Sequence, residues 1–187
     1  DVYKRQMEMR AEDIKHLVAR LKCKYRTCDA EEMCDALGIR VSRKPMGTSP
    51  NSCKGFFMVH NRCKIAVVNN DLDELIQGVI LPHELAHGVL HVDRKIRTFH
   101  ELSYMDETDL LEREANVFAA EFLVDDTALF DIMDSQIDFF HLASLLAVPP
   151  ELLDFKLRLL KQQGYPVNAP YIAQSDFLKR DIRKPLT

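Results

Sequence analysis

The residues best suited to chemistry lie close together in Ile80–His91, where His83, Glu84 and His87 form the pattern H-E-x-x-H. Residues four apart share one face of a helix, so both imidazoles can point at one metal ion. Glu84 then lies beside that ion, where a carboxylate can act as a general base. Two histidine ligands with an adjacent carboxylate are typical of a zinc hydrolase site. Two histidines on an apolar helix also arise by chance, so the interpretation needs a further ligand.

Two candidates for a third ligand follow directly after the histidine pair. His91 shares the face of His87, but it lies about 12 Å from His83 along a straight helix, too far for all three to bind one ion. We expect His91 to be a packed histidine or one that donates to a carbonyl near the site. Asp93 is six residues after His87, but using it requires a glycine at position 90 to turn the chain, and that residue is Leu90.

The third candidate is Glu114, 27 residues after His87, on a helix expected at 109–123. A carboxylate from a second helix that packs across the first would complete a three-ligand zinc site and leave one position for water. We therefore predict Glu114 as the third ligand. Glu112 and Glu121 are expected on other faces of the same helix.

The hydrophobic spacing and the turn residues predict the elements that must position these groups. Asp29 is expected to cap one helix, and Asn69–Asp71 to cap the helix that carries the histidines. Pro82 lies inside that helix and predicts a bend just before His83. Helices are expected near 12–21, 30–37, 72–91, 109–123, 125–133, 137–147 and 151–163, and strands near 39–44, 54–60 and 63–68.

Composition favours an ordinary globular protein, because 47% of the 187 residues are apolar and 29% are charged. The net charge of −4 does not indicate a nucleic-acid or anionic-membrane partner, and no apolar run approaches a membrane span. Five cysteines without C-x-x-C spacing, and no secretory signal, favour a reduced cytoplasmic setting. Residues 1–6 resemble a translated transposon end from a sequencing library and are set aside.

Three blocks of sequence together resemble the ImmA/IrrE metallopeptidases. They are Gly55 with Ile65 and Asn69, the stretch Leu81–His91, and Glu112–Leu123, whose E-A-N-x-F-A run lies at a specific distance from H-E-x-x-H. The closing residues, from Gly164–Tyr165 to 175–179, are also similar, so the resemblance covers nearly the whole chain after Met7. Ala86 stands where glycine is usual, and Pro82 precedes the first histidine, which is a second departure from the common pattern.

The resemblance implies a small α+β zincin fold, with helices around a short, mostly antiparallel sheet. It implies one Zn²⁺ ion bound by His83, His87 and Glu114, with Glu84 as base. It also implies a narrow substrate range, typically one helix-turn-helix repressor of a phage, mobile element or stress regulon. The expected division is a zincin core at 7–124, a helical extension at 125–164 and a tail at 165–187.

Two further predictions concern the oxyanion and the helical extension. Tyr104 or His100, between the two ligand helices, could stabilise the oxyanion. Residues 137–163 have helix-turn-helix spacing, which raises DNA binding as an alternative. Seven acidic and three basic residues at 125–163 argue against it, because a duplex-binding face needs clustered positive charge. A zincin fold that sequesters a repressor with little turnover is the other alternative.

Overall fold

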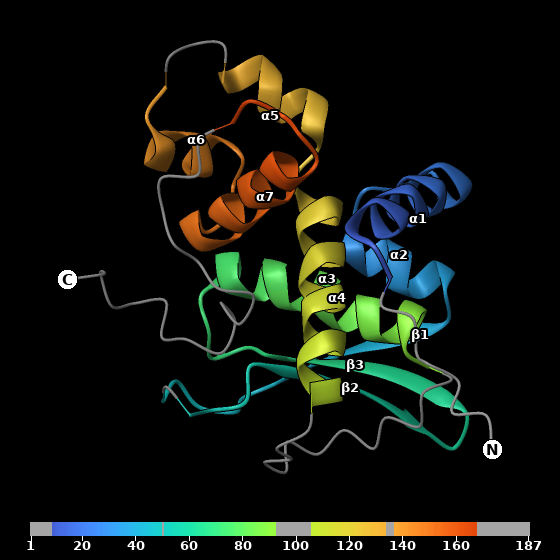
Figure 1. Cartoon of the computed structure of the whole chain (residues 1–187). Coiled ribbons are helices and arrows are strands. Elements are labelled where there is room, and N and C mark those ends of the chain that lie inside the picture. Colours follow the sequence, from blue (N-terminus) through green and yellow to red (C-terminus); the bar gives the residue numbers. More distant parts are fainter. Residues whose placement is uncertain (1–8, 50, 93–105, 134–136, 168–187) are drawn as a thin grey trace.

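A computed structural model describes residues 9–49, 51–92, 106–133 and 137–167 (Figure 1). Within them the chain forms seven helices and three strands. Their bounds are α1 Ala11–Tyr25, α2 Ala30–Ala36, β1 Ile39–Lys44, β2 Gly55–His60, β3 Cys63–Asn69, α3 Glu74–Leu90, α4 Asp106–Leu123, α5 Asp126–Met133, α6 Phe139–Leu145 and α7 Pro150–Gln162. Asp93, His100 and Tyr104 lie outside the described residues.

The three strands form one mixed sheet in the order β1-β3-β2. β2 and β3 are the expected hairpin, in which His60 pairs with Cys63 and Asn61 and Arg62 turn the chain with positive φ. β1 pairs with β3 in parallel, with Ile39 opposite Lys64. The α+β class is therefore confirmed, and one of the two strand pairings is parallel.

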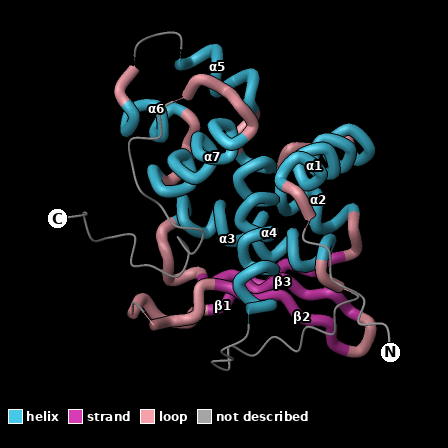
Figure 2. The backbone as a smooth tube through the Cα atoms, in the orientation of Figure 1, coloured by secondary structure: helices cyan, strands magenta, loops and turns pink. Residues whose placement is uncertain are grey.

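The helices α3 and α4 cross each other above one face of this sheet (Figure 2). α3 packs on β2 and β3, and α4 packs between α3 and α1. The core between these layers contains Ile14, Ala66, Leu85 and Phe118, all fully buried. Burying an apolar side chain of the size of leucine or phenylalanine contributes about 1.5–3 kcal/mol, so this contact holds the two central helices in place.

The helix α3 begins later than expected and continues through its proline. Its N-cap is Asp73, whose side chain accepts a hydrogen bond from the Leu75 amide. Asn69, which the sequence suggested as part of a cap, instead donates to the carbonyls of Gly47 and Cys53 and orders the loop before β2. Pro82 lies within the continuous helix. The bend expected before His83 stays a prediction.

Charged side chains of α5 and α7 contact the core beside α7's buried apolar side chains. Lys156 of α7 is fully buried, with its Nζ atom 2.7 Å from Glu121 Oε2 and 2.6 Å from Asp126 Oδ1. Lys15 of α1 also contacts Asp126. The division into core and extension stays a prediction, but charged side chains connect the two across α4. Among the described helices, none has the length and apolar character needed to cross a membrane.

Candidate metal centre

The last turns of α3 bring the two histidines of the H-E-x-x-H pattern together. His83 and His87 are one turn apart and both buried, and their Nε2 atoms lie 3.2 Å from each other. The surrounding α3 residues are buried on every side from Val79 to Gly88. A helix buried in this way holds its side chains in fixed positions, so the two imidazoles face one point.

The third group at this point is Glu112 of α4. Its Oε2 atom is 3.3 Å from His83 Nε2, and its Oε1 atom is 3.5 Å from His87 Nε2. One potential ligand atom from each residue lies within 4.8 Å of the others. Two imidazole nitrogens and a carboxylate are a donor set that suits zinc and leaves room for a water molecule. The residues present therefore fit a catalytic metal ion.

One turn further along α4, Asn116 orients the first histidine. Asn116 Oδ1 lies 3.0 Å from His83 Nδ1 in the buried interior. A carbonyl oxygen only accepts, so Nδ1 of His83 carries the proton and donates it. The neutral ring then has its lone pair on Nε2, which faces Glu112. Hydrogen bonds of this kind fix the ring and raise its basicity as a metal ligand.

Glu84 lies beside the histidine pair and is 5% exposed. Burial raises the pKa of its carboxyl group to about 8, His83 opposes this rise, and Glu112 adds to it. Gly55 of β2 leaves the space that Glu84 needs, because a Cβ atom at position 55 would lie 3.0 Å from Glu84 Oε1. The strand β2 therefore forms one wall of the site.

The charge of Glu112 also acts on His83. Burial alone would lower the pKa of this imidazole, but the hydrogen bond and the negative charge of Glu112 outweigh it and raise the pKa above its ordinary value. The cluster thus favours a positive charge at this point. A divalent cation satisfies the same demand.

In this structure Glu114 contacts another histidine, His91. Glu114 is 1% exposed, its Oε2 atom lies 2.9 Å from His91 Nε2, and its Oε1 atom accepts from the Met9 amide at 2.7 Å. Glu112, which was expected on another face of this helix, is a carboxylate that lies at both histidines. The sequence contains a signal for Glu112 in the position of Asn116, four residues later. Residues four apart share a helix face, and both side chains contact His83.

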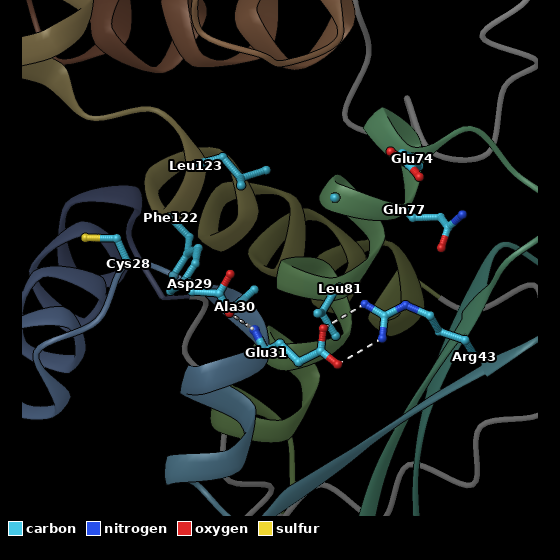
Figure 3. A pocket seen from close by; sticks show the side chains of 11 residues that line it. Cys28, Asp29, Ala30, Glu31, Arg43, Glu74, Gln77, Leu81, Phe122 and Leu123 are labelled. Carbon is cyan, nitrogen blue, oxygen red and sulfur yellow. Dashed lines mark hydrogen bonds and ion pairs between the residues drawn. The ribbon is translucent and has the colours of Figure 1, made fainter.

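A separate cavity of about 530 Å³ lies between α2, β1, α3 and α4 (Figure 3). Arg43 and Glu31 form a two-bond ion pair at its wall, at 2.8 and 2.9 Å. Leu81, Phe122 and Leu123 contribute to its apolar lining. None of the histidines or Glu84 lines this cavity, so it is distinct from the candidate metal centre.

A small α+β fold with two helical histidines, an adjacent glutamate and a carboxylate from a crossing helix is consistent with a zincin-like fold. The family model of the IrrE N-terminal-like domain, peptidase family M78, matches residues 34–158. A similar protein is the "uncharacterized immunity region protein 2" of Bacillus phage phi105, which is 30% identical over 143 residues, or 76% of this chain and 88% of that protein. The chain therefore belongs to the ImmA/IrrE (M78) family of metallopeptidases.

Proposed function

We propose that this protein is a zinc-dependent endopeptidase in which His83, His87 and Glu112 bind the metal and Glu84 is the general base. The observation that carries the proposal is the convergence of Glu112 with both histidines at the buried end of α3. Glu114 was the third ligand expected from the sequence. Its carboxylate faces His91 in this structure, which favours Glu112 for that role.

The residues of the chain divide the chemistry between them. A bound zinc ion supplies Lewis acidity and lowers the pKa of water to about 7. Glu84 takes the proton of the attacking water and returns it to the amine that leaves. Burial makes its carboxylate a stronger base, and the wall formed by Gly55 holds it next to the metal ligands. Asn116 keeps His83 in the orientation that binding requires.

The proposed substrate is a protein regulator, of which a helix-turn-helix repressor of a phage, mobile element or stress regulon is the first candidate. Membership of this peptidase family supports peptidase chemistry in this chain. The name of the phage relative refers to an immunity region, which supports a regulatory substrate. The acidic balance at 125–163 makes a duplex an unsuitable partner for these helices.

The test uses the full chain, zinc and the repressor encoded beside its gene, with intact-mass spectrometry of the products. The wild type is expected to produce two fragments from one peptide bond. Glu84→Gln is expected to bind zinc as the wild type does and to yield no fragments. Glu112→Gln is expected to lose both zinc affinity and cleavage.

Each alternative predicts a different result. Binding of the repressor by both wild type and Glu84→Gln, with no fragments from either, would indicate sequestration in place of hydrolysis. Cleavage that persists in Glu84→Gln would refute the assigned base. Retardation of promoter DNA at low salt, lost as the salt concentration rises, would indicate DNA binding by the chain itself.

A further inference from the structure

A chain of buried hydrogen bonds connects the second histidine of the site to the start of α1. The Met9 amide donates to Glu114 Oε1 at 2.7 Å, and Glu114 Oε2 lies 2.9 Å from His91 Nε2. His91 Nδ1 then lies 2.9 Å from His87 Nδ1. Glu114 is 1% exposed and His91 is 0% exposed, so water does not reach these groups.

The direction of each bond in this chain follows from its first donor. A backbone amide can only donate, and an ionised carboxylate can only accept, so a neutral His91 must carry its proton on Nε2. Its Nδ1 atom then accepts, and the proton in the last bond belongs to Nδ1 of His87. The lone pair of His87 is left on Nε2, which faces His83 and Glu112.

We propose that Glu114 and His91 are positioning residues that set the tautomer of His87 for metal binding. His83 receives the same tautomer from a separate partner, Asn116. Two independent sets of hydrogen bonds at the Nδ1 atoms thus hold the two rings with their Nε2 atoms toward one point. The inference rests on the proposed metal site, but it concerns the protein's own protons and can be tested without metal or substrate.

The decisive variant is Glu114→Gln, which keeps the shape of the side chain. The Met9 amide requires an oxygen opposite it, so the new NH₂ group must face His91 Nε2 and donate to it. His91 then carries its proton on Nδ1, and His87 must accept there and carry its own on Nε2. That proton occupies the position of the metal, so zinc affinity is expected to fall by about 10- to 100-fold, the usual effect of a lost supporting partner.

The experiment records long-range ¹H–¹⁵N spectra of the histidine rings in the metal-free full chain at pH 8, followed by zinc titration against a competing chelator. The wild type is expected to show the Nδ1–H form for His87 and the Nε2–H form for His91. Glu114→Gln is expected to reverse both, while His83 stays as in the wild type. His91→Phe removes the acceptor, so His87 is expected to populate both forms.

Two matched variants separate this role from a general effect. Glu112→Gln is expected to weaken zinc binding without changing the tautomer of His87 or His91. Glu12→Gln makes the same change on the exposed side of α1 and is expected to alter neither measurement. A wild-type His87 with its proton on Nε2, or a Glu114→Gln protein with wild-type tautomers and zinc affinity, would overturn the inference. Tight zinc binding with correct tautomers but no proteolysis would instead refute the proposed function.

Discussion

Gly55 packs closely against the candidate base, and replacing it by alanine should separate catalysis from metal binding. The added Cβ atom would lie 2.5 Å from Ile80 Cγ2, 2.9 Å from the Val67 carbonyl oxygen and 3.0 Å from Glu84 Oε1. Ordinary contacts between such atoms are about 3.5–4.0 Å. The Ile80 methyl group can move, but the Val67 carbonyl belongs to the central strand, so the adjustment falls on β2 and on Glu84.

The expected magnitudes follow from that crowding. Overpacking of this kind costs about 1–3 kcal/mol, which lowers the melting temperature by about 2–12 °C for a domain of this size. A catalytic group displaced by about 1 Å loses on the order of 100-fold in rate. The zinc affinity of Gly55→Ala should stay close to that of the wild type, because none of the three atoms nearest to the new Cβ belongs to a proposed metal ligand.

The assays are thermal melting followed by circular dichroism, zinc competition, and cleavage of the repressor. Gly78→Ala is the matched control, since a Cβ atom there meets nothing within 4 Å and alanine in a helix interior is favoured by about 0.5–1 kcal/mol. The reasoning is refuted if Gly55→Ala melts and cleaves as the wild type does, or if both glycine variants lose activity equally.

Three further predictions concern stability. Zinc at 100 times its dissociation constant should add about 2.7 kcal/mol and raise the melting temperature by about 5–11 °C; a shift below 1 °C would contradict the metal site. Lys156→Met should lower the free energy of unfolding in urea by about 3–5 kcal/mol. This loss should shrink as the pH falls, because protonation neutralises Glu121 and Asp126, and burial already raises the pKa of Glu121. A loss independent of pH would argue against the ion cluster. Asp29→Ala removes the acceptor for two amides at the start of α2 and should cost about 0.5–2 kcal/mol, whereas an unchanged unfolding midpoint would show the cap to be dispensable.

Local signals in the sequence predicted nearly every element of the fold. The turn at Asn61 and Arg62 identified the β2–β3 hairpin, and Asp29 identified the start of α2. The parallel pairing of β1 with β3 was not predicted, because it joins strands that are distant in sequence and leaves no local pattern. The cap of α3 was misplaced because Asn69 and Asp73 have equally suitable side chains, and only the tertiary structure assigns Asn69 to the loop.

The sequence was sufficient to predict the part of the candidate site that lies on a single helix. The spacing of His83 and His87 gave the pair, and their burial confirms their position in the interior. The choice between Glu112 and Glu114 depends on the angle at which α4 crosses α3. The hydrophobic periodicity of the sequence does not reveal that angle. Glu112 contacts the histidine pair, and Glu114 contacts His91 at the end of the same helix. The position of a glutamate beside the apolar stripe of α4 therefore could not decide which of the two binds the metal.

The buried ammonium group of Lys156 has a consequence for anyone who exchanges parts between members of this family. A chimera joined after α4 keeps Glu121 but receives its last helices from another protein. If that donor has an apolar residue at the position of Lys156, the hybrid leaves a carboxylate in the interior without its cation. A compatible donor must supply a lysine at position 156, or positions 121 and 156 must both be made apolar. These two positions therefore indicate whether a chimera is compatible before any protein is made.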